Sequence, residues 1–464
     1  MAFPLKDVRY STRRARGEDA AGGVAETRAL YPRLLRDRSV LPKVSIAVQY
    51  FESQVGHERR EMDPEVLVQF FGDHKLARCV VASLATSYRY RSPEFVQVCS
   101  PGALRRLERA GASTPKGLRA ALYARLNGSD GTGDGFLRRS DQAETYGSME
   151  RSFALRGGQL ERLLYLDAAE HAVLGRTGPT PAPEDVVANY NFGILETLLR
   201  HAPQIELTLT DGQGVTLSRL EAGAREVAGA NGVDATLHRG GGTARLRLAG
   251  RPDALGSWTR HGRRVARTVV QLLERGRRSV LEGSALVVLR DRRAELRLTP
   301  EVLDLLSGDG APDAGWDDLP GWDAPAVAAA VAGGGKRRPA AESTGGAVWG
   351  LRRLPEAQAW ASGVLVPEVR LVHGAAAARV CAVRSPRHGV RLARVAGGAR
   401  SGEPVVFFGA PPAVAPLLAA GLPAVATDAA DLRPVLDAVE VPPPPPPAPP
   451  ARRARGRTPL PFES

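Results

Sequence analysis

The spacing of apolar residues changes near residue 200, and this change constrains the fold more than any other feature of the chain. Before it, segments such as residues 44–57 and 63–90 carry apolar side chains at steps of three and four, which is typical of amphipathic helices. After it, "QIELTLT" at residues 204–210 alternates apolar and polar residues, which is typical of a half-buried strand. The chain therefore joins helical and strand-rich regions, and we predict a multidomain α+β fold.

We predict three folded domains. A mainly helical domain spans residues 25–199 and contains a flexible loop near 127–148. A small α+β domain with an Arg-rich helix spans residues 200–306, where a strand, a helix and a Gly-turned hairpin follow one another. An α/β domain spans residues 349–440, because short strands there alternate with helical segments.

Three polar segments flank or join these domains. Residues 1–24 are rich in Gly and Arg and are predicted to form a flexible arm. Residues 307–348 are rich in Gly, Ala, Asp and Pro and are predicted to form a linker. Residues 441–464 begin with polyproline and continue with four arginines, which predicts a disordered, extended basic tail. These arginines are Arg452, Arg453, Arg455 and Arg457.

Arginine dominates the charge of the chain. The sequence has 63 Lys and Arg against 50 Asp and Glu, which gives a formal net charge of +13. An excess of this size favours a polyanionic partner such as nucleic acid, bound mainly by electrostatic attraction. The alternative is a GC-rich genome, which enriches Arg, Ala, Gly and Pro whatever the protein does.

The basic excess is concentrated in residues 251–300, which hold 12 Arg against 5 acidic residues. On the helix that begins near Trp258, four arginines share one face and apolar residues occupy the other. A cluster on one face suits a phosphate track, since its charges reach one backbone together. The alternative is a solvated face that is balanced by acids from another domain. The four residues are Arg260, Arg263, Arg264 and Arg267.

The cysteines and the N-terminus bear on the compartment. Cys79, Cys99 and Cys381 form no CxxC pair and have no histidine at ligand spacing, which argues against a structural zinc and a disulfide framework. The N-terminus lacks the apolar core of a signal peptide, and no apolar run reaches the length of a membrane span. We therefore expect a cytoplasmic protein without a membrane partner.

The stretch "VLVPEVRLVHGAAAARVCAVRSP" at residues 364–386 is predicted to form two strands joined by a short turn. Glu368 supplies a carboxylate in the first strand, where many metal-dependent nucleases hold a metal ion. The second strand has Ala382 and Arg384 where a second carboxylate is required. The hairpin is therefore either a working active site or the remnant of one.

The order of four segments is similar to that of a known family. The segments are "GDHKLARCVVASL" at 72–84, "LERLLYLDAAE" at 160–170, "PEDVVANYN" at 183–191, and "LRLAGRPDAL" with "WTRHGRRVARTVVQLL" within 246–273. In this order and spacing, the chain resembles the XPB-helicase-binding endonuclease family, first described in archaea. The resemblance spans roughly residues 30–440.

The resemblance implies a division of labour among the domains. The N-terminal helical domain and a small ferredoxin-like domain position an XPB-type helicase and forked or branched DNA in this family. A C-terminal PD-(D/E)xK-like nuclease domain then cuts one strand near the fork. Its chemistry requires carboxylates from a helix and two successive strands, which hold divalent metals against the scissile phosphate.

Transferred onto this chain, the catalytic motif of the family is mostly missing. The family's "PDF" stands here as Pro367-Glu368-Val369, and its "EIVG" corresponds to Ala382-Val383-Arg384-Ser385. The helix that supplies the first glutamate corresponds to residues 323–334, where alanines replace acids. Glu368 alone is a poor ligand set for Mg²⁺, and Arg384 repels a cation. We therefore predict a degenerate nuclease with a vestigial Glu368, salt-bridged or at the rim of the domain, and with no metal site and no cofactor.

Other polar residues are weaker candidates. Asp167 and Glu170 are predicted to share a helix face, and the endonuclease hypothesis uses one of them to complete a site with Glu368. His373 and His388 are more often incidental than functional in such loops, and Tyr190 is predicted to close a helix break.

Three hypotheses follow, and the prediction leans against an enzyme. The first is a DNA-binding accessory protein without nuclease activity that partners an XPB-type helicase. The second is an active structure-specific DNA endonuclease that uses Mg²⁺ or Mn²⁺. The third is a structural protein whose basic charge reflects composition alone.

Overall fold

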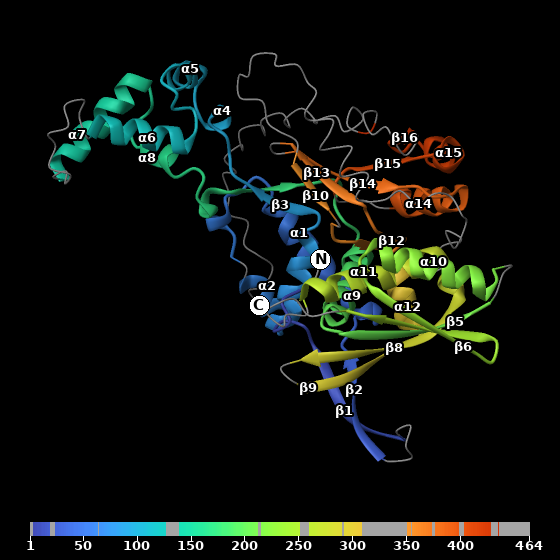
Figure 1. The fold of residues 1–464 in the computed structure, drawn as a ribbon. Coiled ribbons are helices and arrows are strands. Elements are labelled where there is room, and N and C mark those ends of the chain that lie inside the picture. The colour runs from blue at the N-terminus through green and yellow to red at the C-terminus, as the bar shows by residue number, and fades with distance from the viewer. Residues whose placement is uncertain are drawn as a thin grey trace. The chain divides into compact units, whose positions relative to one another are not determined.

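A computed structural model describes residues 3–18, 24–63, 65–126, 139–211, 215–250, 259–289, 292–308, 350–353, 355–373, 376–398, 403–427 and 435. Within these ranges, the side chains of residues 15–18, 24–27, 126, 139–143, 259–260, 350–351, 353, 373 and 376 are not described. The predicted multidomain α+β class is confirmed in this general form, since the chain contains many helices and several separate sheets (Figure 1).

The chain divides into two compact units that interleave in sequence. The first unit comprises Met1–Tyr50, Glu65–Ser87 and Thr177–Val441, and the second comprises Phe51–Pro64, Tyr88–Arg176 and Pro442–Ser464. The helical domain predicted over residues 25–199 is therefore not a single continuous body. Its N-terminal and C-terminal parts belong to the first unit together with the strand-rich regions. There the helix at His74–Leu84 packs against the helix at Pro183–Arg200.

The first unit contains a seven-stranded sheet with the order β1-β2-β9-β8-β5-β7-β6. Neighbouring strands are antiparallel except for the β2–β9 pair, which is parallel. The strands are β1 (Tyr10–Glu18), β2 (Val24–Pro32), β5 (Gln204–Thr210), β6 (Asp234–Gly240), β7 (Thr243–Ala249), β8 (Val280–Leu289) and β9 (Arg292–Leu298).

Strand alternation decides which face of this sheet is buried. In β5, Ile205, Leu207 and Leu209 are buried, whereas the residues between them are half-exposed. The predicted strand at 204–210 and the predicted hairpin of β6 and β7 are confirmed, and a two-residue glycine turn joins that hairpin.

Helices cover the apolar face of the seven-stranded sheet (Figure 1). They are α9 (Pro183–Arg200), α10 (Leu217–Ala230), α11 (Thr259–Gly276) and α12 (Pro300–Ser307). Helix α11 crosses α9 at Gly262, where a Cβ atom would lie 1.8 Å from the carbonyl oxygen of Arg200. Only glycine permits so close an approach, so Gly262 fixes the position of α11 between the neighbouring elements.

The first unit also contains a five-stranded sheet with the order β10-β13-β14-β15-β16. The first three strands form an antiparallel meander, and β14, β15 and β16 run parallel. Helix α14 (Pro386–Gly398) connects β14 to β15, and α15 (Pro411–Ala419) connects β15 to β16. The strands are β10 (Gly350–Arg353), β13 (Val369–His373), β14 (Ala376–Ala382), β15 (Val405–Gly409) and β16 (Ala424–Ala426).

The remaining elements of the first unit are short. A small sheet pairs β11 (Gln358–Trp360) with β12 (Gly363–Leu365). The helices are α1 (Leu41–Ser53), which runs into the second unit, α2 (Glu65–Phe71) and α3 (His74–Leu84). Asp73 caps α3, because its carboxylate accepts hydrogen bonds from the backbone N–H groups of Lys75 and Leu76 at 3.0 and 3.1 Å.

The second unit is mainly helical. Its helices are α4 (Phe95–Val98), α5 (Pro101–Arg109), α6 (Pro115–Leu126), α7 (Arg139–Phe153) and α8 (Gln159–Leu164), and one sheet pairs β3 (Tyr88–Arg91) with β4 (Val173–Arg176). Thr114 caps α6, since its hydroxyl accepts a hydrogen bond from the backbone N–H of Gly117 at 3.1 Å. Leu118, Leu160 and Met149 meet in a common core.

Two predicted flexible segments are wrong where the structure describes them. In the predicted arm at 1–24, residues 10–18 form β1, which pairs along its whole length with β2. In the predicted loop near 127–148, residues 139–148 belong to α7, which is anchored by the buried Met149. Residues 127–138, 309–349 and 441–464 lie outside the described residues, so the linker and the tail stay predictions.

Candidate functional site

The candidate site lies at one edge of the five-stranded sheet. Glu368 directly precedes β13, and Ala382 is the last residue of β14. The two strands are antiparallel with Val369 opposite Val380, so Glu368 and Ala382 lie at the same edge. The carboxyl ends of the parallel strands β14 and β15 also end there, which is where α/β sheets commonly bind ligands.

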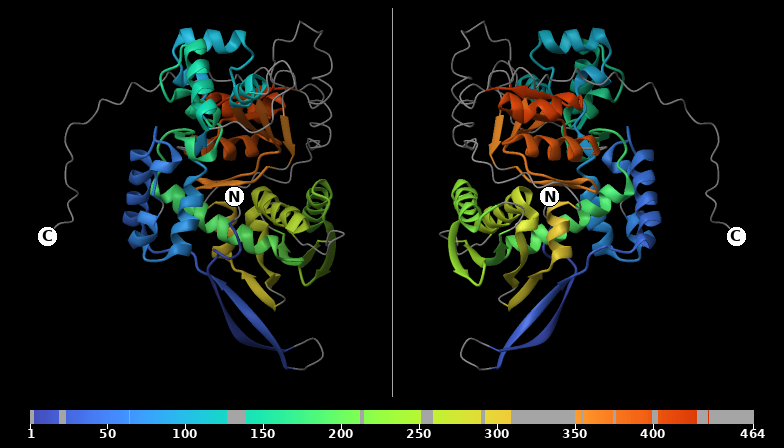
Figure 2. Two further views of the ribbon diagram at one scale, coloured as in Figure 1. Left: turned by 90° about the vertical axis from the view of Figure 1, so that its left-hand side faces the viewer. Right: turned by 90° about the vertical axis from the view of Figure 1, so that its right-hand side faces the viewer.

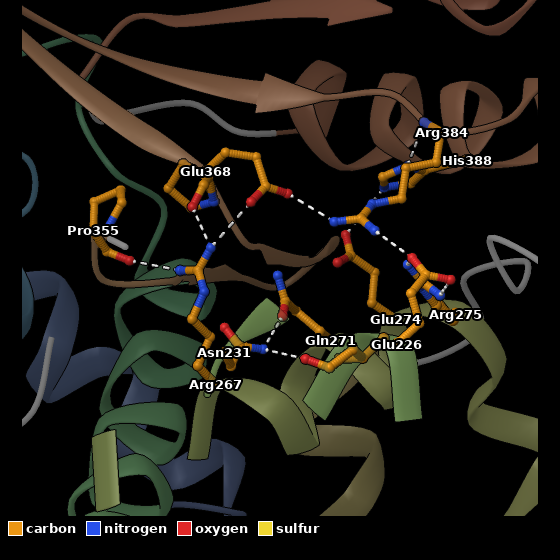
Figure 3. Close-up of polar contacts among 12 residues, drawn as sticks. Glu226, Asn231, Arg267, Gln271, Glu274, Arg275, Pro355, Glu368, Arg384 and His388 are labelled. Carbon is orange, nitrogen blue, oxygen red and sulfur yellow. Dashed lines mark hydrogen bonds and ion pairs between the residues drawn. The ribbon is translucent and has the colours of Figure 1, made fainter. Parts of the chain in front are cut away.

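Glu368 lies between two guanidinium groups at this edge (Figure 3). Its Oε1 accepts a hydrogen bond from Arg384 at 3.0 Å, and its Oε2 is 3.5 Å from Nη2 of Arg267. The carboxylate is only 6 % exposed. Of the two alternatives predicted for Glu368, a salt bridge or a position at the rim of the domain, the structure shows the salt bridge, and both carboxylate oxygens face a positive charge.

The placement of Arg267 corrects the predicted phosphate track. Its guanidinium is buried and donates to the carbonyl oxygens of Pro355 at 3.0 Å and Pro367 at 2.7 Å. Burial lowers the pKa of Arg267, and this outweighs the attraction of Glu368. Arg267 thus joins α11 to the five-stranded sheet and is out of reach of a DNA phosphate.

The other arginines of the predicted track do not share one exposed face with Arg267. Arg263 is exposed, whereas Arg264 is half-buried with its guanidinium beside Gly232. The side chain of Arg260 lies outside the described residues, as do Arg452, Arg453, Arg455 and Arg457. Helix α11 is buried over most of its length because elements pack against it from several sides, which its amphipathic pattern did not predict.

A second buried ion group lies next to Glu368 and Arg267. Glu274 of α11 accepts a hydrogen bond from Nη1 of Arg391 at 2.5 Å, and its Oε1 is 3.3 Å from Nε2 of His388. Arg391 is 2 % exposed and also donates to the carbonyl oxygens of Ser307 and Val364, each at 3.2 Å. Burial alone would raise the pKa of Glu274, but Arg391 and His388 hold it near 2.

His388 has a defined role in this group. Its Nδ1 accepts the backbone N–H of Arg384 at 3.2 Å, which requires the proton to sit on Nε2, where it is donated to Glu274. Burial lowers the pKa of His388 and outweighs the effect of Glu274. The ring is therefore neutral and serves as a connector between the β14–α14 turn and α11.

Two further residues complete the cluster. Glu226 of α10 pairs with Arg275 at 3.0 Å and lies 3.8 Å from Nη1 of Arg384. Burial works against the charge of Arg384, but Glu368 outweighs it and raises the pKa of Arg384. We call the following residues the ion cluster: Glu226, Arg267, Glu274, Arg275, Glu368, Arg384, His388 and Arg391.

The charge balance of the ion cluster decides what it can do chemically. Four guanidinium groups face three carboxylates around a neutral imidazole, so a cation that entered would meet a surplus of positive charge. Among the residues that the structure describes, no group of three His, Cys, Asp or Glu side chains is arranged to hold a metal ion. The ion cluster instead joins α10 and α11 to the five-stranded sheet.

The acids considered as partners of Glu368 are engaged elsewhere. Asp167 belongs to the second unit and receives two hydrogen bonds from Arg119 at 2.9 and 2.8 Å. Glu170, also in the second unit, has an exposed side chain. Tyr190 lies inside the continuous helix α9 and is buried, so the predicted helix break is wrong. The side chain of His373 is outside the described residues.

Sequence reasoning missed most of the ion cluster, although one signal was present. Arg267, Gln271 and Glu274 follow one another at steps of four and three. They form a polar stripe of mixed charge within residues 265–274, where every other residue except Thr268 is apolar. Gln271 accepts a hydrogen bond from the buried Asn231 at 2.7 Å, so the whole stripe is used inside the protein. Opposite charges on one stripe indicate an internal contact better than they indicate a phosphate track.

Comparison with known proteins gives no family for the chain. No protein-family model matches it, and no curated protein sequence is significantly similar to it. In the described part of the chain, every helix is too short or too polar to cross a lipid bilayer.

Proposed function

We propose that this protein is a DNA-binding accessory factor without nuclease activity, resembling the nuclease partner of an XPB-type helicase. The observation that carries the proposal is the position of Glu368 between Arg267 and Arg384. The residue that matches a metal ligand of the family is used here as a buried counter-ion. A net charge of +13 supports a polyanionic partner for the rest of the molecule.

The sheet topologies support the domain assignments behind this proposal. The order β8-β5-β7-β6, with α10 after β5 and α11 after β7, supports a ferredoxin-like domain. The meander of β10, β13 and β14, followed by α14 and the parallel strand β15, supports the PD-(D/E)xK-like domain that the resemblance implies. Retained architecture with replaced acids favours a binding role over a hydrolytic one.

The electrostatics explain why the cleavage chemistry is disfavoured. A metal ion at Glu368 would have to displace two guanidinium groups. The buried Arg267 would then lose its paired carboxylate, and the half-buried Arg384 would keep only the more distant Glu226. Breaking a buried ion pair in this way costs about 3–5 kcal/mol. Mg²⁺ also needs one or two carboxylates together with substrate phosphate, and Ala382 offers no ligand.

Cytoplasmic location is part of the proposal. Cys79, Cys99 and Cys381 are all free thiols, and Cys79 and Cys381 are buried. Free cysteines are typical of proteins in a reducing compartment.

A labelled DNA fork tests the proposal directly. Fluorescence anisotropy at low salt should report binding, and incubation with Mg²⁺ or Mn²⁺ should leave the fork intact. Pull-down with the XPB-type helicase of the same organism should recover a complex. Absence of both fork binding and the complex would end the proposal. Metal-dependent cleavage that Glu368→Ala abolishes would instead support the endonuclease hypothesis.

A further inference from the structure

One carboxylate of the ion cluster is open to solvent. The side chain of Glu226 is 53 % exposed, whereas those of Glu274 and Glu368 are 9 % and 7 % exposed. Glu226 comes from α10, which lies with α11 between the seven-stranded and the five-stranded sheet of the first unit (Figures 1 and 2). It therefore marks the side from which a ligand in solution reaches the ion cluster.

Two guanidinium groups converge on one oxygen of Glu226 (Figure 3). Nη2 of Arg275 lies 3.0 Å from Oε1, and Nη1 of Arg384 lies 3.8 Å from the same atom. Arg275 belongs to α11, whereas Arg384 lies in the turn between β14 and α14. The second distance is longer than a hydrogen bond, so Glu226 pairs closely with only one of the two cations. A tetrahedral anion, whose oxygens lie further apart, can reach both.

The charges of the ion cluster favour an anion with two negative charges. With Glu226 in place, four guanidinium groups face three carboxylates. Burial lowers the pKa of Arg275, and the nearby charge of Arg384 lowers it further, so the two cations repel each other. When Glu226 turns to solvent, the surplus rises to two positive charges. A phosphate monoester supplies almost two negative charges at pH 7, whereas a phosphodiester supplies one.

The location also suits an anion. Strands β14 and β15 run parallel, and their carboxyl ends lie at the edge where α/β sheets commonly bind ligands. Helix α14 begins at Pro386, two residues after Arg384, so the positive end of its dipole lies at the same edge. The sheet position and the helix dipole thus act in the same direction as the two arginines.

We propose that Arg275 and Arg384 bind a phosphate monoester, which displaces the carboxylate of Glu226. In the absence of this ligand, Glu226 occupies the place of the phosphate and keeps the two arginines apart from solvent anions. The monoester is the terminal phosphate of a DNA strand or a small phosphate ester that shares its chemistry. The first source rests on the proposed DNA-binding function, and the second does not.

The test uses the full chain and three ligands. Two are oligothymidylates of equal length, one with phosphates and one with hydroxyls at its ends, and the third is inorganic phosphate. Isothermal titration calorimetry measures the affinity of each. The phosphorylated oligothymidylate should bind more tightly than the hydroxyl form. Because the second pKa of a phosphate monoester is near 6, the ratio of the two affinities should rise about tenfold from pH 5 to pH 7.

Two substitutions in the ion cluster should act in opposite directions. Glu226→Gln removes the competing carboxylate and should tighten binding of the phosphorylated oligothymidylate by up to about fivefold. Arg384→Gln removes a charged donor and should weaken it by about tenfold or more. Glu221→Gln is the matched control for the first, since Glu221 lies on the same helix and pairs with Arg239 instead. It should leave the affinity unchanged.

The outcomes separate this inference from the function on which its first source rests. Equal binding of the two oligothymidylates, unchanged in Glu226→Gln, leaves DNA binding intact and overturns the phosphate site alone. Weaker binding in Glu226→Gln as well as in Arg384→Gln also overturns the site, because both residues then act only in the packing of the protein. Binding of inorganic phosphate without binding of either oligothymidylate supports the site with a small phosphate ester and refutes the proposed function. Binding of none of the three ligands refutes both.

Discussion

Replacement of Glu368 by alanine separates a structural counter-ion from a metal ligand. The substitution removes the carboxylate that lies between Arg267 and Arg384 and leaves both guanidinium groups in place. Arg267 keeps two backbone carbonyl partners but loses its nearest carboxylate. Arg384 keeps only the more distant Glu226 at 3.8 Å. The protein then holds an uncompensated positive charge in a buried position.

The expected loss follows from the energetics of broken buried ion pairs. Removing one partner of a buried ion pair lowers the free energy of unfolding by about 3–5 kcal/mol. Because Arg267 keeps its two carbonyl partners, we expect a loss at the lower end of this range, about 3 kcal/mol. For a cooperative unit of 150–250 residues or more, this lowers the melting temperature by about 6 °C. Differential scanning calorimetry of the purified chain measures the shift. Glu282→Gln, an exposed carboxylate on β8, is the control and should change stability by no more than about 0.5 kcal/mol.

The sign of the shift is decisive. Active-site residues are often held at a cost to stability, so removing a true metal ligand tends to leave the melting temperature unchanged or to raise it. A stabilised Glu368→Ala variant that has lost Mg²⁺-dependent cleavage would refute the structural reading of this residue. A destabilised variant with unchanged DNA binding is the outcome that the buried ion cluster requires.

Three further predictions concern the same region. Arg267→Ala should lower the melting temperature while the salt slope of DNA binding stays unchanged, whereas Arg263→Ala, at an exposed position, should leave the melting temperature unchanged. Burial lowers the pKa of His388, so as the pH falls the unfolded chain takes up a proton at this histidine before the folded chain does. The contribution of His388 to the free energy of unfolding should therefore be constant above pH 6.5 and fall as the pH drops below it. Glu274, with its pKa lowered to about 2, should add a second loss as the pH falls from 4.5 toward 2, and urea titrations at several pH values measure both. Gly262→Ala should lower the free energy of unfolding by about 3 kcal/mol or prevent folding, since its methyl group would overlap the carbonyl of Arg200 in α9. A urea midpoint equal to that of the unaltered chain would contradict the close helix crossing.

Local signals in the sequence predicted several elements correctly. Proline is common at the first position of a helix, and α6 begins at Pro115 and α9 at Pro183. Alternation at 204–210 predicted β5. In these cases the residues that specify the element lie within it or directly beside it. A short stretch of the sequence is therefore enough to predict the element.

The sequence did not predict elements whose formation depends on residues far away in the chain. Strand β1 has few apolar residues and forms because β2 pairs with it, and β2 in turn pairs with β9, where Leu30 lies opposite Leu296. Helix α14 begins at Pro386 in a segment with few apolar residues, and its placement depends on the close approach of Gly389 to the carbonyl oxygen of Ala413 in α15. Neither cause is visible within one window of sequence.

The candidate site shows the same limit in its electrostatics. The sequence drew attention to Glu368 and Arg384, which lie close together in the chain, and the structure pairs their side chains at 3.0 Å. The sequence did not reveal that Arg267 arrives at the same carboxylate from α11, a hundred residues earlier in the chain. Composition indicated an excess of arginine but not which arginines are already paired.

The pairing of arginines decides what the sheet edge at Glu368 can attract. At this edge, Arg267 is buried, Arg384 is half-buried, and both are paired with Glu368, so their charges are compensated inside the protein and exclude a cation. An acid introduced at Ala382 would not recreate a metal site on its own, because it would become a further counter-ion for these guanidinium groups. We therefore expect a polyanion to be attracted by arginines that lack internal carboxylates and not by the segment in which arginine is most frequent in the sequence.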